Sequence, residues 1–264
     1  MHVATAQLPH IDASDDKIFL TPNAVIVLDG ASAFRPVPVP ASTYAADLGQ
    51  HIADGLLGEP NADLRAVVRD AIDATARALA LEPGNSPSST VVILRRRGDQ
   101  VDALALGDSV IILPGQIITD QRIDDLDLEQ RRKYRERLAS GTGYDEAHRH
   151  LLRELQTQQA AQRNTNGGYW IAEANPEAAI HAVTAIFPIE DVPWAILATD
   201  GAHDVMTHLG IDDWPKLSQA DGPELAAILE RCQSWEDEAD PDGVELPRAK
   251  RHDDKTVVAV DLRV

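Results

Sequence analysis

The segment Trp194–Asp204, with the sequence W-A-I-L-A-T-D-G-A-H-D, decides the fold class of this chain. Its apolar run has the length and composition of a buried strand, and it ends in an Asp-Gly pair. Two other segments have a related form, namely V-I-V-L-D-G-A-S at Val25–Ser32 and H-D-D-K-T-V-V-A-V at His252–Val260. Each segment therefore predicts a strand with an acidic side chain at one end.

Carboxylates at the ends of several strands can assemble a site for hard divalent cations, because the sheet holds the like charges together and the metal neutralises them. An Asp-Gly pair alone is only a turn signal. The pair also occurs at Asp54, Asp221 and Asp242, where no strand-like apolar run precedes it. The informative feature is thus the conjunction of the three segments.

A fourth element lies between the first two segments. Ser89–Leu94 and Val101–Leu106 have the pattern of an antiparallel hairpin, and Gly107-Asp108-Ser109 follows directly. The short connections here and in the strands up to Thr119 favour antiparallel pairing.

In this order the motifs resemble those of the metal-dependent protein phosphatases, the type 2C family, in its bacterial form. The resemblance extends over roughly residues 3–262. It implies an α+β fold in which two mostly antiparallel sheets are flanked by helices in a four-layer α-β-β-α sandwich. It also implies that the carboxylates converge at one edge of the sandwich.

The resemblance assigns roles to the acidic residues of the motifs. Asp29 is the bridging carboxylate, the Gly30 carbonyl is a further ligand, and Asp200 and Asp253 complete the first metal site; Asp29 and Asp200 are the expected catalytic residues. Asp15 takes the ligand position of a second metal with Asp16 behind it, Asp108 is the ligand of a third, weaker metal, and Asp204 holds metal-bound water.

Other interpretations of these residues stay open. Asp254 competes with Asp253, because the family has Asn at the second position of this pair. Asp15 is also compatible with a plain acidic loop, Asp108 with a structural turn and Asp204 with an exposed helix surface.

Two departures from the family pattern concern the substrate. Ile11 stands where the family has a phosphate-binding Arg, so the bidentate clamp is missing. Ala31-Ser32 replaces the His that often follows the first Asp-Gly and is proposed as a general acid. Arg35 and His10 are possible substitutes for the Arg, and His203 for the proton donor.

Composition restricts the partners and the metal. A formal net charge of −19 disfavours nucleic acid and anionic membranes, since both need clustered Lys and Arg. The short clusters at Arg95–Arg97 and Arg131–Lys133 are interpreted as solvated faces. A single cysteine, Cys232, is interpreted as a packed thiol; it excludes an intramolecular disulfide and a thiolate cage and favours a reducing, cytoplasmic compartment. Oxygen ligands favour Mg²⁺ or Mn²⁺ over Zn²⁺.

The motifs reach from one end of the chain to the other, so we expect one phosphatase-like domain over residues 1–264. Helices are predicted around Tyr44–Leu56 and, with Asn61 as N-cap, Leu64–Leu79. Residues 120–170 are polar and helical in pattern, and they occupy the place of the family's variable helical and flap segment. A strand is predicted at Tyr169–Ala172.

The expected function is a metal-dependent phosphoserine and phosphothreonine protein phosphatase that uses two, or with Asp108 three, Mg²⁺ or Mn²⁺ ions. Such an enzyme hydrolyses a phosphoprotein in one step with metal-bound water. Two alternatives stay open: a metal-dependent hydrolase of a small phosphoester, which the missing Arg favours, and a catalytically silent regulatory module with the same fold.

Overall fold

The apolar runs of the sequence form the central strands of two five-stranded sheets, in a computed structural model that describes residues 1–31 and 36–263. Every strand pair in the two sheets is antiparallel. In order across the first sheet the strands are β1 (His2–Leu8), β10 (Lys255–Asp261), β9 (Trp194–Ala198), β6 (Val110–Leu113) and β7 (Gln116–Ile118). The second sheet contains β2 (Lys17–Leu20), β3 (Ala24–Leu28), β4 (Val91–Arg97), β5 (Gln100–Leu106) and β8 (Val183–Pro188).

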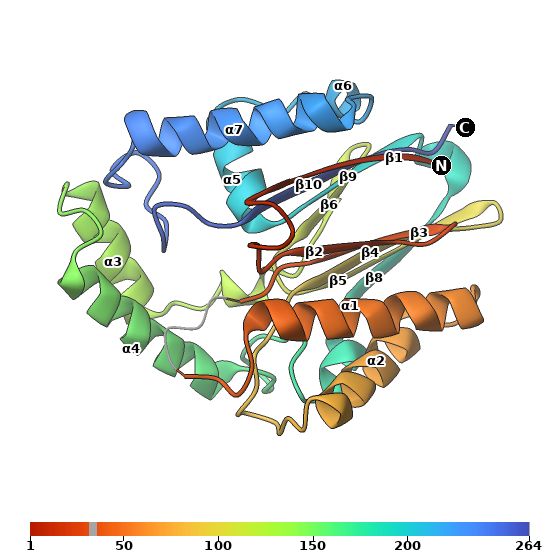
Figure 1. Cartoon of the computed structure of the whole chain (residues 1–264), viewed down its shortest axis with the longest axis horizontal. Coiled ribbons are helices and arrows are strands. Elements are labelled where there is room, and N and C mark those ends of the chain that lie inside the picture. Colours follow the sequence, from red (N-terminus) through yellow and green to blue (C-terminus); the bar gives the residue numbers. More distant parts are fainter. Residues whose placement is uncertain (32–35, 264) are drawn as a thin grey trace.

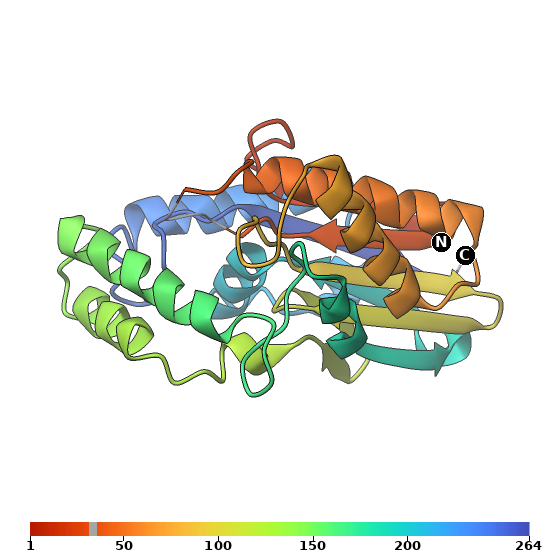
Figure 2. The same ribbon diagram turned by 90° about the horizontal axis from the view of Figure 1, so that it is seen from below.

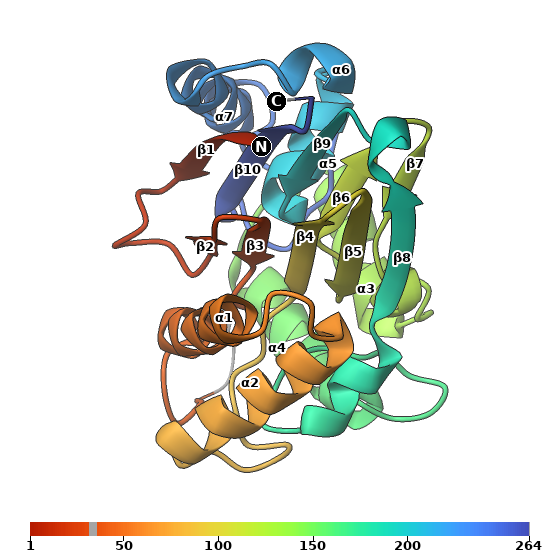
Figure 3. The same ribbon diagram turned by 90° about the vertical axis from the view of Figure 1, so that its right-hand side faces the viewer.

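Helices cover the outer face of each sheet (Figures 1 and 3). The helices over the second sheet are α1 (Ala41–Gly58) and α2 (Leu64–Ala78), and those over the first sheet are α5 (Asp200–His208), α6 (Trp214–Leu217) and α7 (Gly222–Glu238). The central strands are covered on both faces, which explains why β3 and β9 are apolar throughout instead of alternating. The expected four-layer α+β sandwich is confirmed.

Three apolar cores hold the layers together. Val27, Leu197 and Val258 belong to the core between the two sheets. A second core joins the second sheet to α1 and α2, and a third joins the first sheet to α5, α6 and α7. Cys232 lies buried in the third core, as the sequence predicted.

The polar segment after β7 forms a separate helical pair at one end of the sandwich (Figures 1 and 2). The short helix η1 (Gln121–Ile123) leads into α3 (Glu129–Ala139) and α4 (Glu146–Gln162). These two helices pack through their own small apolar cluster of Tyr134, Leu138, Leu152 and Leu155. The pair projects beyond the sheet ends, where it forms one wall of the cavity described below.

Three sequence predictions are wrong. Tyr169–Ala172 is not a strand, because it makes only isolated bridges. The apolar pattern that suggested a strand arises because Trp170 and Ala172 pack in the core between the second sheet and its helices. Two short helices, η2 (Pro176–His181) and η3 (Ile189–Asp191), flank β8. The N-cap of α2 is Asp63, whose carboxylate accepts a hydrogen bond from the Ala66 amide, and not Asn61.

The third wrong prediction concerns the two basic clusters, in which Arg95 and Arg131 are buried and not solvated. Arg95 lies directly opposite Asp102 in the β4–β5 ladder, and its guanidinium donates to that carboxylate and to the carbonyls of Pro60 and Ala62. Local sequence shows only a basic cluster, because the acidic partner faces it across the hairpin.

Among the helices of the described residues, none combines the length and apolarity needed to span a membrane.

Candidate active site

Acidic side chains from separate parts of the chain line one cavity of about 640 Å³ at the end of the sandwich beside α3 and α4. Asp29 directly follows β3, Asp108 lies between β5 and β6, Asp200 begins α5 after β9, and Asp253 precedes β10. Each of these positions is the end of a central strand, so the sheets bring together residues that are far apart in sequence. The structure thus places four sequence-predicted site residues on one surface.

The glycines of the two Asp-Gly motifs are needed for close packing of these segments. A Cβ on Gly201 would overlap the backbone carbonyl of Asp254, and a Cβ on Gly30 would lie 2.8 Å from the backbone oxygen of Asp15. Gly30 also bridges to Ser89, which ties the first motif to the start of the β4 hairpin. The motifs therefore combine a carboxylate with a residue small enough to let the neighbouring acidic segment approach.

Burial and mutual repulsion raise the pKa values of the clustered carboxyls. Burial raises the pKa of Asp29 well above its usual value, with further contributions from Asp16, Asp200, Asp253 and Asp108. The pKa of Asp200 rises to about 6 through burial and the charges of Asp253 and Asp204, although hydrogen bonds with Asp29 and the Gly201 amide lower it. A divalent cation would relieve this repulsion.

Asp108 is part of the same electrostatic group. Its pKa is raised well above the usual value, first by burial and then by the charge of Asp200. Asp204 lines the cavity too, but its side chain is exposed and lies 3.3 Å from Nδ1 of His203. An exposed position at the rim suits a residue that contacts water in the site.

Asp15 and Asp16 occupy different environments. The Asp15 carboxylate accepts a hydrogen bond from the Ser42 amide in α1, at 3.1 Å, and this residue is not among those that line the cavity. The Asp16 carboxylate is fully buried; Oδ2 accepts from Thr199 at 3.0 Å, and Oδ1 has no hydrogen-bond partner. The pKa of Asp16 rises to about 7, first because of burial. Asp16 is therefore the member of the pair that contributes to the potential at Asp29.

Asp253 and Asp254 are also distinguished by the fold. Asp253 lines the cavity. Asp254 points to the β1–β2 loop, where Oδ2 accepts hydrogen bonds from Ser14 Oγ and from the Asp15 amide. The geometry thus supports Asp253 as the member of the pair at the site, with Asp254 fastening the neighbouring acidic loop.

Of the residues predicted to replace the missing Arg and His, His203 lines the cavity and His10 does not. Ile11 is exposed in the loop between β1 and β2, and His10 is largely exposed beside Asp12 and away from the cavity lining. His203 lines the cavity near Trp214. Arg35 and Ser32 lie outside the described residues.

Asp124 and Lys250 are among the charged residues of the cavity that sequence reasoning missed. Asp124 sits in a charged stretch with no motif, so no local signal could have identified it. Lys250 Nζ donates to Asp253 Oδ1 at 2.5 Å. Burial by itself would lower the pKa of Lys250, but the charges of Asp253, Asp29 and Asp254 raise it overall. The position of Lys250, three residues before Asp253, was the only available hint.

The donor set suits Mg²⁺ or Mn²⁺, because the acidic residues of the cavity supply carboxylate oxygens, and a buried oxygen of Asp16 lacks a hydrogen-bond partner. Within residues 1–31 and 36–263, however, no three His, Cys, Asp or Glu side chains already converge on one point. The Asp253 carboxylate instead forms an ion pair with Lys250. The residues thus fit a cation chemically.

Comparison with solved structures identifies the fold. The chain is similar to the PPM Ser-Thr phosphatase MsPP from Mycobacterium smegmatis in complex with cacodylate, with 17% identity and a TM-score of 0.55 over 99% of this chain and 98% of that one. The catalytic domain of the serine/threonine phosphatase PstP in complex with two manganese ions shares 18% identity, with a TM-score of 0.54 over 98% and 97% of the two chains. Stp1 from Staphylococcus aureus shares 13% identity, with a TM-score of 0.58 over 98% and 94%.

No protein-family model and no curated protein matches the sequence. At identities of 11–18% the structural likeness concerns the fold. The resemblance found in the motifs is confirmed at that level, since the similar structures span nearly the whole chain: this protein has the fold of the PPM serine/threonine phosphatases.

Proposed function

We propose that this protein is a metal-dependent phosphatase that hydrolyses phosphoserine and phosphothreonine in proteins. The observation that carries the proposal is the convergence of Asp29, Asp108, Asp200 and Asp253 on one cavity, at the ends of central strands in a PPM fold. Carboxylates that raise one another's pKa in this way destabilise the protein unless they bind cations. Such a cluster is therefore best explained by function.

Asp29, Asp200 and Asp253, with Asp108 and the Gly30 carbonyl, would hold two or three Mg²⁺ or Mn²⁺ ions. When bound, two divalent cations supply a hydroxide nucleophile near neutral pH and positive charge for the phosphoryl oxygens. Gly201 and Gly30 keep the acidic segments in contact. Asp204 and His203 line the rim of the cavity, where they can exchange protons with water and with the leaving group. That residues 1–264 form one phosphatase-like domain in the cytoplasm stays a prediction.

A metal-dependent hydrolase of a small phosphoester is the second candidate. It is favoured by Ile11, an exposed apolar side chain at the position where an Arg was expected. A catalytically silent module with the same fold is the third.

The test measures phosphate release from phosphoserine and phosphothreonine peptides, phosphorylated metabolites and a chromogenic phosphoester, each with added Mn²⁺ and with excess chelator. Asp29→Asn should abolish release. Asp99→Asn, in the exposed β4–β5 turn, makes the same charge change away from the cavity and serves as the control. Release from peptides supports the protein phosphatase, release from metabolites alone supports the second candidate, and no release from any substrate supports the silent module.

A further inference from the structure

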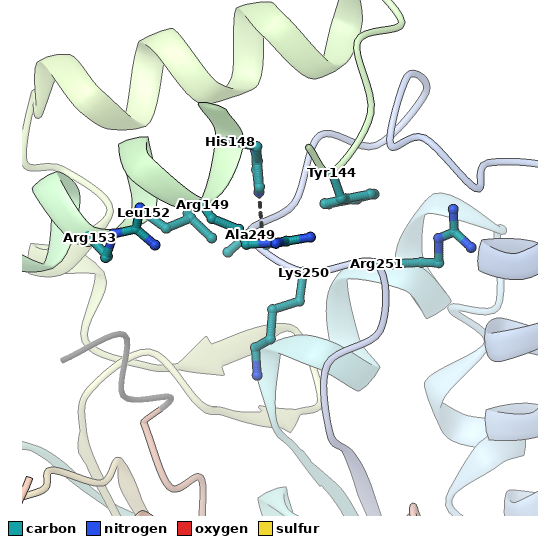
Figure 4. A pocket seen from close by; sticks show the side chains of 8 residues that line it. All are labelled: Tyr144, His148, Arg149, Leu152, Arg153, Ala249, Lys250 and Arg251. Carbon is teal, nitrogen blue, oxygen red and sulfur yellow. Dashed lines mark hydrogen bonds between the residues drawn. The ribbon is translucent and has the colours of Figure 1, made fainter. Parts of the chain in front are cut away.

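Lys250 places an ammonium group among the acids of the cavity. Its side chain leaves the loop after α7 on the side away from Tyr144 and His148 (Figure 4), and Nζ donates to Asp253 Oδ1 at 2.5 Å. The Lys250 side chain keeps 31% of its surface exposed, so it lies at the wall of the cavity and not within the core. The charges of Asp29 and Asp254 act on the same ammonium.

Among the described residues, the arginines that line the cavity make no hydrogen bond or ion pair with a proposed metal ligand. Arg248 pairs with Asp240 at 2.7 Å, and Arg131 donates to the carbonyl of Ile123. In the part of the chain that the structure describes, Lys250 is the one cation lining the cavity that contacts a proposed metal ligand. It is therefore the cation best placed to act at the site.

Charge balance explains why such a cation is needed. Four carboxylates, those of Asp29, Asp108, Asp200 and Asp253, would offset the charge of two divalent ions, so these ions and their ligands would by themselves present no net positive charge to a phosphoryl group. The protein lacks the expected Arg at position 11. A lysine has a flexible four-carbon stem and three donor hydrogens, so its ammonium can move from a carboxylate oxygen to a phosphoryl oxygen nearby.

We propose that Lys250 is the phosphate-binding cation of this site: it pairs with Asp253 in the metal-free protein and contacts a phosphoryl oxygen of the substrate when metal and substrate are bound. This inference rests on the proposed function. It predicts two effects of opposite sign when the ammonium is removed. Phosphate binding should weaken, while metal binding should strengthen, because Asp253 loses a competing partner and the ions lose a nearby like charge.

The experiment uses the full chain and titration calorimetry with Mn²⁺ first and then with inorganic phosphate on the Mn²⁺-loaded protein. Lys250→Met should weaken phosphate binding roughly 10- to 100-fold, the effect of one charged hydrogen bond, and should lower the Kd for Mn²⁺. Lys250→Arg should recover part of the phosphate affinity. Lys216→Met, an exposed lysine of α6 that does not line the cavity, is the matched control and should change neither constant.

The outcomes separate the two proposals. If wild-type protein binds neither Mn²⁺ nor phosphate, the proposed function fails. If wild-type protein binds both and Lys250→Met binds phosphate equally well, the assignment of Lys250 is overturned while the phosphatase proposal stands. If Lys250→Met keeps the wild-type melting temperature but binds both Mn²⁺ and phosphate more weakly, the assignment is also contradicted. The assignment requires the Kd for Mn²⁺ to fall while the Kd for phosphate rises.

Discussion

Gly201 lies directly against the backbone carbonyl of Asp254, with no room between them for a side chain. This contact joins the start of α5 to the segment that enters β10, and so it places Asp200 beside Asp253. The first motif repeats the arrangement, since Gly30 packs against the backbone of Asp15. The acidic cluster is thus assembled by close backbone contacts as much as by the strands themselves.

Gly201→Ala should therefore disturb the site. The added methyl group must push the α5 start away from Asp254, which should reduce stability by about 1–3 kcal/mol and weaken Mn²⁺ binding. Gly58→Ala is the matched control, because Gly58 at the end of α1 has free space around it and no left-handed backbone. Denaturant unfolding and calorimetry with Mn²⁺ measure the two effects. Equal behaviour of both variants would show that the contact is not required.

Asp29→Asn should remove activity by orders of magnitude but leave the fold intact. The pKa of Asp29 is raised by burial and by its acidic neighbours, so the neutral amide relieves repulsion in the metal-free protein. In chelator the variant should melt at the same temperature as the wild type or higher. A clearly lower melting temperature would mean that Asp29 has a structural role that a cation does not explain.

Metal should stabilise the wild-type protein. A cation that binds only the folded state contributes about 2.7 kcal/mol at a concentration ~100 times its Kd. For a chain of this length that corresponds to a rise in melting temperature of roughly 5–10 °C between excess chelator and saturating Mn²⁺. A melting curve that does not respond to Mn²⁺ would count against a metal site in this cavity.

The metal-free protein should lose stability as the pH rises from about 4 to 7. Burial raises the pKa of Asp16 from 3.8 to about 7, and that of Asp200 rises to about 6. A carboxyl whose pKa is raised in the folded state stabilises the fold while it is protonated, and this contribution is lost as the pH passes through the folded-state value. Ionising buried Asp16 should cost on the order of a few kcal/mol.

Melting curves in chelator across this pH range measure the effect. Asp16→Asn should reduce the slope, because the amide stays neutral at every pH, and the difference between the two proteins removes the contribution of the histidines. Saturating Mn²⁺ should flatten or reverse the trend, since cations favour the ionised carboxylates. A metal-free melting temperature that increases with pH would contradict the assigned environment of Asp16.

Arg95→Met should be strongly destabilising, by about 3–5 kcal/mol, because it leaves the carboxylate of Asp102 buried with one of its two arginine partners removed. Because Arg97 still contacts Asp102 in this variant, we expect the loss of stability to fall in the lower part of that range. Urea unfolding measures the loss. Arg69→Met, an exposed pair with Asp70 on α2, should change stability by less than about 1 kcal/mol.

The sequence by itself determined that central strands are covered on both faces and that acidic residues stand at their ends, while the four-layer arrangement came from the resemblance of the motifs to a known family. Runs such as Val25–Leu28 and Trp194–Ala198 have no polar face, which requires strands that are covered on both sides, and an Asp-Gly pair at the end of such a run marks where the strand stops. These are local properties, because burial and turn formation are encoded within a few neighbouring residues.

Only the tertiary structure decided which acids share the cavity and which cation accompanies them. The Asp15 amide bonds to the Asp254 carboxylate across 239 positions of sequence, and this contact turns Asp254 away from the cavity that Asp253 lines. The pairing of Lys250 with Asp253 and that of Arg95 with Asp102 likewise depend on how loops and strands face each other. Electrostatic partners are set by distance in space, and a distance of a few ångströms between remote segments follows from the packing of the whole sandwich.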